Sequence, residues 1–432
     1  MSSPNNASEL IATKALRIGM FVELDVGWLS HPFPTSSFKI TSENQLDTIL
    51  GLGLGQVRWV PSKSDPLVDV TPTLDGDRST VVAQERQVAA DHVAQARRER
   101  ANLLGDQQSS LSACEKRFSD AANQYRKTLD LMHSNPKEAA AQVGGMVSGL
   151  LGQMLAEGES AIRLLSESAG DKFVLHPVNV TIVSLLLGKA MGLSQAALQD
   201  LGVAAFLHDV GKMQLPERVR WVEDSFSSAE VKLYQEHVAQ SVMMGKAMDL
   251  SKSALLTIAQ HHEMADGTGY PSHVKVESMG TGGRILSLVN RYDNLCNPSR
   301  TAAALTPHES LSLIFSQMKS RFDSVTLSAF IRMMGVYPPG SVVQLIDDRF
   351  AIVTSVNSAR PLKPRIIVHE PGVPKHEALI VDLEHMPFLG IRRSLKPSAL
   401  PSASLDYLAP RQRISYFFEQ TAAPAETESR TN

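Results

Sequence analysis

Histidine stands out when the chain is searched for side chains that could do chemistry. Five of its thirteen histidines fall between positions 176 and 262, and an aspartate directly follows one of them. Neutral imidazoles together with a carboxylate form a ligand set that suits iron, manganese or zinc. Any one of these histidines alone would fit a packed core position, but the cluster as a whole predicts a metal site. The residues concerned are His176, His208, Asp209, His237, His261 and His262.

Two short motifs lie within this stretch. The first reads FLHDVGK, from Phe206 to Lys212, and the second reads HHEMADGTGYP, from His261 to Pro271. They resemble the HDxGK and HHExxDGxGYP signatures of the HD-GYP family, a branch of the HD-domain phosphohydrolases that hydrolyses cyclic di-GMP. The resemblance covers roughly residues 170–335. It implies an all-helical, metal-dependent phosphodiesterase that linearises cyclic di-GMP, with either pGpG or GMP as the end product.

The resemblance also implies roles for individual residues. The histidine cluster would hold two divalent transition-metal ions, iron or manganese, which Asp209 would bridge as a catalytic residue. Lys212, also catalytic, and Arg284 would bind the substrate phosphates, where fixed cations meet developing negative charge. The loop of Gly269, Tyr270 and Pro271 would border the substrate pocket or contact a diguanylate cyclase (GGDEF) partner. Glu263 is expected to orient a ligand histidine, because ligating imidazoles need a partner on their other nitrogen.

Three positions depart from the family pattern. Lys172 stands where some relatives have a glutamate that supports a third metal, so a site for two metals is expected here. Asn179 replaces a family arginine. Asn290 replaces an aspartate that ligates metal; its amide can still offer a carbonyl oxygen as a ligand but brings no negative charge.

Asn290 keeps an alternative function open. The chain could be a weak or inactive sensor that binds cyclic di-GMP or a diguanylate cyclase without turnover. A phosphohydrolase acting on another nucleotide is a third hypothesis, which the complete second motif disfavours.

Helices must bring these side chains together. Leu198, Leu201, Ala205 and His208 follow steps of three and four, which turns the histidine toward the interior. Ser194 is an expected N-cap, and Ser227 with Glu230 forms a plausible capping box before His237. His176-Pro177 suits the first turn of a helix, and Gly211 is expected to end the helix that carries His208. The stretch from Thr281 to Cys296 reads as a buried helix, in which Cys296 is expected to be core.

The expected fold class is mainly α. Strand-like alternation flanks a helical stretch near the N-terminus, which looks like the uncharacterised domain often found ahead of HD-GYP domains; His31 in it is expected to be structural. Alternation returns beyond Pro338 and predicts a small β appendage. The expected organisation is an α/β module at 1–65, a linker at 66–81, a helical connector at 82–168, the catalytic domain at 169–335, the β appendage at 336–420 and a disordered tail at 421–432.

Composition narrows the class of protein. With 43% apolar and 20% charged residues and a net charge of −3, the chain reads as an ordinary soluble protein without a basic surface for DNA. Its two cysteines are too few for a disulfide framework, so a cytoplasmic location is expected. No apolar run approaches the roughly 18 residues of a membrane helix. An apolar stripe from Val143 to Met154 predicts either core or a homodimer contact.

Overall fold

The computed structural model describes residues 8–24, 33, 37–65, 78–156, 159–166, 172–223, 225–299, 303–356, 360–386 and 389–421. The chain divides into two compact units. One comprises Met1–Gln108 with His369–Leu379, and the other comprises Ser109–Val368 with Ile380–Asn432. His31 and the expected tail from residue 422 onward lie outside the described residues.

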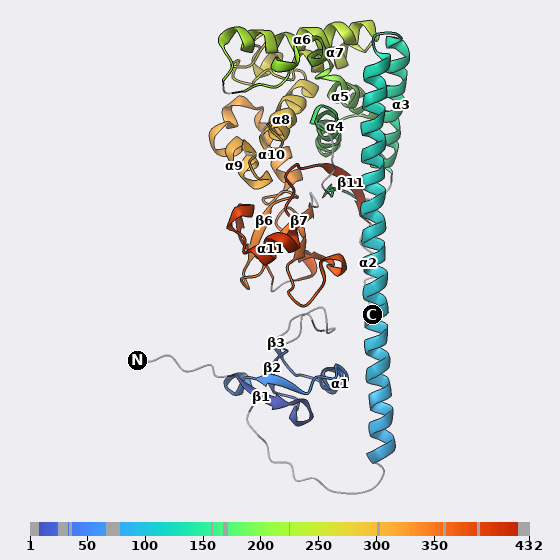
Figure 1. Cartoon of the computed structure of the whole chain (residues 1–432), viewed down its shortest axis with the longest axis vertical. Coiled ribbons are helices and arrows are strands. Elements are labelled where there is room, and N and C mark those ends of the chain that lie inside the picture. The colour runs from blue at the N-terminus through green and yellow to red at the C-terminus, as the bar shows by residue number, and fades with distance from the viewer. Residues whose placement is uncertain are drawn as a thin grey trace, which may run out of the picture. The chain divides into compact units, whose positions relative to one another are not determined.

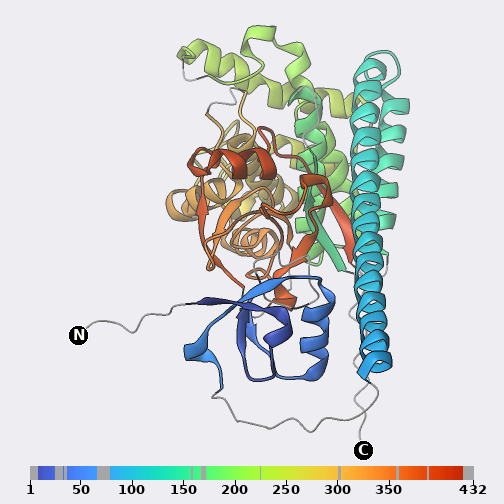
Figure 2. The same cartoon turned by 60° about the horizontal axis from the view of Figure 1, so that its bottom comes forward.

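The N-terminal unit holds a four-stranded antiparallel sheet in the order β1-β4-β2-β3. Helix α1, Glu43–Gly51, begins at the N-cap Ser42 and lies beside the sheet (Figure 2). It buries Ile49 in the same core as Val22 and Val57 of the sheet. The alternation of residues 16–25 predicts one long strand, but only Phe21–Glu23 forms a strand there, and the strand Glu9–Ala12 was not expected. The strands are β1 Glu9–Ala12, β2 Phe21–Glu23, β3 Ser37–Lys39 and β4 Gln56–Trp59.

Two long helices follow. Helix α2, Arg78–Leu131, is continuous through the stretch that lacks helix breakers, and α3 spans Pro136–Leu155. The apolar stripe of α3 is buried within the chain, which agrees with the core alternative for Val143–Met154. The helical connector predicted up to residue 168 is wrong at its end, because Glu159–Leu164 is a strand, β5.

A bundle of helices forms the middle of the second unit. The helix α4 contains Pro177 in its interior, so the expectation that His176-Pro177 opens the helix is wrong. The helix α5 ends at Leu207, four residues before Gly211, so that expectation is wrong too. The predicted caps at Ser194 and Ser227 are confirmed. The helices are α4 Lys172–Ala190, α5 Gln195–Leu207, α6 Ser228–Ala247, α7 Lys252–Ala259, α8 Thr281–Cys296, α9 Pro307–Gln317 and α10 Ser324–Met334.

Helix α4 corrects one expectation from composition. Within the described residues it is long and apolar enough to cross a membrane, contrary to the prediction. Its most apolar window is 83% buried inside the fold, and the helix carries His176 into the bundle. Such burial is typical of a core helix, so the apolar composition of α4 is explained by packing.

A seven-stranded antiparallel sheet follows the bundle and takes its strands from both sides of the sequence. Its main path is β10-β6-β7-β5-β11; β8 pairs with β7, and β9 pairs with β8. Strands β5 and β11 lie side by side although about 250 residues separate them, with Tyr416 opposite Leu164 (Figure 1). The short helix α11, Ser402–Leu408, precedes the last strand. The strands are β5 Glu159–Leu164, β6 Val342–Leu345, β7 Phe350–Val356, β8 Arg365–Val368, β9 Ile380–Asp382, β10 Ile391–Leu395 and β11 Tyr416–Thr421.

Candidate metal centre

The predicted ligand residues come from four places in the helical bundle. His176 lies within α4, and His237 lies within α6. His208 and Asp209 occupy the turn that follows α5, while His261 and His262 occupy the turn that follows α7. The side chains of these two turns point toward the space between α4 and α6. The ligand side chains, which are spread over residues 176–262 in the sequence, therefore lie together there.

Asp209 is at the centre of this arrangement. One carboxylate oxygen, Oδ2, lies 3.5 Å from Nε2 of His176 and 3.4 Å from Nε2 of His208. The other, Oδ1, lies 3.5 Å from Nε2 of His237 and 3.7 Å from Nε2 of His261. The ligand atoms therefore form two groups that share Asp209. The first group is His176, His208 and Asp209, and the second is Asp209, His237, His261 and His262.

Hydrogen bonds fix the tautomers of three imidazoles. The Nδ1 atoms of His208, His237 and His261 lie 2.5–2.7 Å from the carbonyl oxygens of the residues three positions earlier. A carbonyl oxygen can only accept, so each Nδ1 carries the proton and each Nε2 presents a lone pair. The Nδ1 of His176 lies 2.5 Å from the carboxylate of Asp293, which has the same consequence. Four Nε2 lone pairs therefore point toward Asp209.

These atoms fit a divalent metal ion. Nε2 of His176 is 3.2 Å from Nε2 of His208, and the same distance separates His237 from His261. Two lone pairs at such a distance repel each other unless a cation lies between them. Among the described residues, buried Oδ1 of Asp209 and Nε2 of His262 have no hydrogen-bond partner. A buried set that contains only acceptors, nitrogen with one carboxylate, matches the ligands of first-row transition metals.

Burial keeps the histidines in the form that binds metal. It lowers the pKa of His237 to about 4. It also lowers the pKa of His176, and those of His261 and His262 fall well below their ordinary value. These imidazoles are neutral at pH 7 and hold their lone pairs without first losing a proton.

The carboxylate of Asp209 is held ionised by its neighbours. Burial alone would raise its pKa, but the ammonium of Lys212 and then His208 hold the pKa well below its ordinary value. Nζ of Lys212 donates to Oδ2 at 2.6 Å, and both side chains are buried. Lys212 thus lies at the centre as a fixed cation.

Trp221 borders this cation and was missed in the sequence. The ammonium groups of Lys212 and Lys172 each lie 4.6 Å from the centre of its ring. Trp221 stands in an irregular segment without apolar periodicity, so no local pattern marked it. Two cations and an aromatic ring therefore lie together beside the ligand cluster.

Gly211 in the first motif has a packing role. A Cβ atom at this position would lie 2.2 Å from the carbonyl oxygen of His237 and 2.4 Å from the amide nitrogen of Ser241. Its own N–H donates to Oγ of Ser241 at 2.9 Å. Only glycine allows the turn with Asp209 to approach α6 so closely.

The second motif builds a loop over His262. The ring of Tyr270 stacks on that of His262 with 4.6 Å between ring centres, while Pro271 is exposed. The expectation that Glu263 orients a histidine is wrong: its two carboxylate oxygens accept the backbone N–H groups of Ser272 and Val274. Glu263 therefore fixes the backbone just after the loop of Gly269, Tyr270 and Pro271.

Two further predicted residues are already engaged elsewhere. The guanidinium of Arg284 donates to the carbonyl oxygens of Met279 and Val276 and lies 3.7 Å from Asp323. The carbonyl oxygen of the Asn290 side chain accepts from Asn294 at 2.7 Å. Their assigned roles in phosphate and metal binding stay predictions.

Asp293 is a second residue near the ligands, after Trp221, that the sequence patterns did not single out. It lies three residues after Asn290 on α8 and contacts His176, 117 residues earlier in the chain. An aspartate after a buried helical face could have been noted as a partner for an imidazole, but no spacing rule links it to His176.

Comparison with known proteins agrees with these features. Residues 157–325 match the HD domain, and residues 9–143 match a domain of unknown function, DUF3391, which includes all of α2. The HD domain recognised from the two motifs and the uncharacterised domain expected ahead of it are thereby confirmed.

Relatives extend over different shares of the chain. Cyclic di-GMP phosphodiesterase PA4108 of Pseudomonas aeruginosa is 22% identical over 83% of this chain and 84% of its own length. Cyclic di-GMP phosphodiesterase PdeB of Borreliella burgdorferi is 24% identical over 45% of this chain, which spans about half (51%) of that relative. The 3'3'-cGAMP-specific phosphodiesterase 3 of Vibrio cholerae is 24% identical over 38% of this chain and 35% of its own length.

Proposed function

We propose that this chain, which carries an HD domain behind a DUF3391 domain, is a metal-dependent phosphodiesterase that hydrolyses cyclic di-GMP. The observation that carries the proposal is the pair of ligand groups that meet at the two oxygens of Asp209. Relatives named as cyclic di-GMP phosphodiesterases, one of them similar over most of both chains, support the choice of substrate.

Two divalent ions, iron or manganese, are the proposed cofactors. His176 and His208 would hold one ion, while His237, His261 and His262 would hold the other, and Asp209 would bridge them. Paired ions of this kind activate water and neutralise charge on phosphoryl oxygens. Asn290 remains a further candidate ligand if its side chain turns from Asn294.

The cations near the centre would bind the substrate. Cyclic di-GMP carries two phosphodiester groups, each with one negative charge. Lys212 is anchored by Asp209, and the amine of Lys172 donates to the side-chain oxygen of Asn294 at 3.2 Å. A buried ammonium at this place offers fixed positive charge to a phosphate without reorganisation. We retain Arg284 as a second phosphate contact, which would require it to leave Asp323.

The exposed edge of the second motif is the proposed partner surface. Gly269 and Tyr270 would border the substrate pocket, since Tyr270 stacks on the ligand His262. Pro271 is exposed and could contact a diguanylate cyclase. A cytoplasmic location and a homodimer complete the proposal, together with pGpG and then GMP as products.

The decisive experiment measures hydrolysis by metal-loaded protein. Purified chain is stripped with chelator, reloaded anaerobically with Mn²⁺ or Fe²⁺, and incubated with cyclic di-GMP or 3'3'-cGAMP, with products separated by chromatography. We expect linear pGpG from cyclic di-GMP and a lower rate with 3'3'-cGAMP. The matched variant Asp209→Asn keeps the side-chain shape, removes the shared charge, and should lose both metal and activity.

Two outcomes would overturn the proposal. Wild-type protein that holds metal and binds cyclic di-GMP without cleaving it would be a sensor, the alternative that Asn290 keeps open. Faster cleavage of 3'3'-cGAMP than of cyclic di-GMP would show that cyclic di-GMP is not the preferred substrate.

A further inference from the structure

His176 is held differently from the other ligand histidines. The Nδ1 atoms of His208, His237 and His261 donate to carbonyl oxygens three residues earlier, so local backbone orients these rings. His176 instead donates to Oδ2 of Asp293 on α8. Its orientation therefore depends on how α8 lies against α4.

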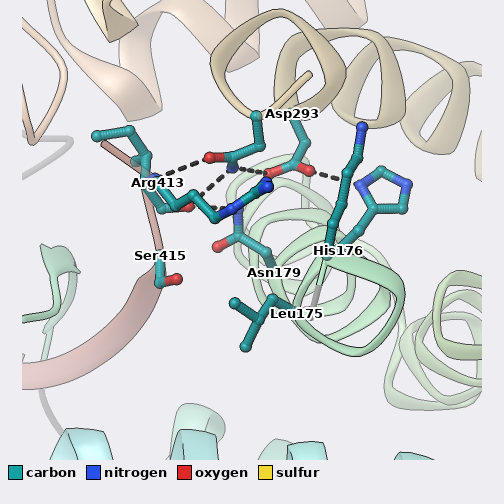
Figure 3. Close-up of a pocket in the computed structure, with 9 residues that line it drawn as sticks. Leu175, His176, Asn179, Asp293, Arg413 and Ser415 are labelled. Carbon is teal, nitrogen blue, oxygen red and sulfur yellow. Dashed lines mark hydrogen bonds and ion pairs between the residues drawn. The ribbon is translucent and has the colours of Figure 1, made fainter. Parts of the chain in front are cut away.

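The carboxylate of Asp293 is itself held on its other oxygen. Oδ1 accepts from Nδ2 of Asn297 at 2.9 Å and from Nδ2 of Asn179. All three side chains are buried, and Figure 3 shows Asp293 near both the ring of His176 and the carboxamide of Asn179. Both oxygens of Asp293 are therefore occupied, which fixes the carboxylate that orients His176.

The same two carboxamides bind the backbone that leads into β11. Asn297 accepts from the N–H of Ile414 and donates to its carbonyl oxygen, each at 2.8 Å. Asn179 accepts from the N–H of Tyr416 at 2.8 Å and donates to the carbonyl of Ile414 at 3.3 Å. On the opposite edge, the carbonyl of Ser415 accepts from the N–H of Leu165. Backbone groups at alternate residues face the same edge of a strand, so the carboxamides act as a neighbouring strand would.

We propose that the segment Ile414–Tyr416 is a positioning element of the metal centre. Through Asn179 and Asn297 it holds Asp293, which sets the orientation and basicity of His176. The segment thereby tunes metal affinity at the group of His176, His208 and Asp209, while the group with His237, His261 and His262 has no such link among the described contacts. The inference rests on the proposed function only in that these groups hold metal.

The consequence is a route from the C-terminal sheet to the active centre. Residues 414–416 lie outside the matched HD domain, which ends at residue 325. Displacement of β11 from α4 and α8 would loosen the orientation of His176, whereas His237, His261 and His262 would keep their positions. The chemistry of one metal position would then depend on a part of the chain that contributes no ligand.

The test titrates Co²⁺ into the chelator-stripped full chain and monitors visible absorption. The d–d bands of Co²⁺ depend on its ligands, so the two sites give different spectra. The bridge is the pair of carboxamides that join the segment to Asp293, and Asn297→Ala removes one of them. Ile414→Pro removes the N–H that donates to Asn297, together with the buried side chain of Ile414. Phe417→Leu is the matched control, because this buried side chain of β11 affects packing without touching the bridge. Loss of a ligand's own hydrogen-bond partner, here Asp293, typically weakens metal binding about 10- to 100-fold, and we expect both bridge variants to weaken one Co²⁺ site by up to that factor. The other site should change less than about twofold, and the control should leave both unchanged.

A double-variant cycle separates positioning from simple loss of stability. If the strand acts through Asp293, then Asp293→Asn combined with Ile414→Pro should weaken the affected site no more than Asp293→Asn alone. Additive losses, equal weakening of both sites, or the same loss in Phe417→Leu would overturn the inference.

A second readout does not need metal. The Nδ1–H proton of His176, bonded to a carboxylate, should give a downfield NMR signal in the metal-free chain, assigned by its loss in His176→Gln. Ile414→Pro should shift or broaden it, and an unchanged signal would contradict the link. Wild-type chain that shows this signal and two Co²⁺ sites yet cleaves no cyclic di-GMP would refute the proposed function and leave the inference standing.

Discussion

Nζ of Lys212 lies 2.6 Å from Oδ2 of Asp209, and both side chains are almost fully buried. The same oxygen faces His176 and His208, so Lys212 and a metal ion would share one carboxylate. The ammonium therefore balances Asp209 in the metal-free protein and competes with metal for it. Stability and metal affinity should respond to Lys212 in opposite directions.

We expect Lys212→Met to destabilise the metal-free chain by about 3–5 kcal/mol, because it leaves a buried carboxylate unpaired. Metal-loaded protein should lose much less, and metal should bind at least as tightly as in wild type. Turnover should fall roughly 10²- to 10³-fold, as for loss of a fixed electrostatic contact. Urea unfolding with and without metal, together with kcat, measures these effects. An unchanged kcat would remove Lys212 from the mechanism.

Glu263→Gln should loosen the loop of the second motif. Its carboxylate accepts two backbone N–H groups, whereas an amide would turn an N–H₂ group toward one of them. We expect about 1–3 kcal/mol of lost local stability, seen as faster hydrogen exchange over residues 268–275. KM should rise while metal content stays the same. Loss of metal instead would mean that Glu263 supports a ligand after all.

Gly211→Ala should separate Asp209 from His237. The added methyl group meets backbone atoms of α6, which cannot move as a flexible side chain would. Overpacking typically costs about 1–3 kcal/mol, and metal content should fall as well. Gly149→Ala is the matched control, since nothing lies within 4 Å of its Cβ position and alanine favours helix. The control should raise the melting temperature slightly; equal behaviour of the two variants would contradict the packing role.

Acid should destabilise the metal-free protein. The pKa of His237 falls from 6.5 to about 4 on folding, so between these values the unfolded chain binds a proton that the folded chain does not. Unfolding free energy therefore decreases as the pH falls, by about 2 kcal/mol between pH 7 and pH 5 for this residue alone. Urea unfolding at both pH values measures the change, and His237→Gln should reduce it. An equal or higher stability at pH 5 would show that the histidines are not buried as neutral rings.

The chemistry of the centre could be predicted from sequence because its residue types are unusual and closely grouped. His208-Asp209 and His261-His262 stand in short motifs, and Ser194 and Ser227 mark helix starts through contacts three residues away. Such signals are local, so they survive without any knowledge of the fold. Helix α2 was likewise predictable, since its long stretch contains almost no residue that breaks a helix.

Tertiary structure alone decided how these residues are arranged. Which oxygen of Asp209 faces which histidines depends on the packing of α4 and α6 around two turns. The strand β5 was predicted as helix because its partner β11 lies about 250 residues away, and pairing at that distance leaves no mark within either segment. Asp293 reaches His176 for the same reason: a contact made across the bundle carries no spacing in the sequence.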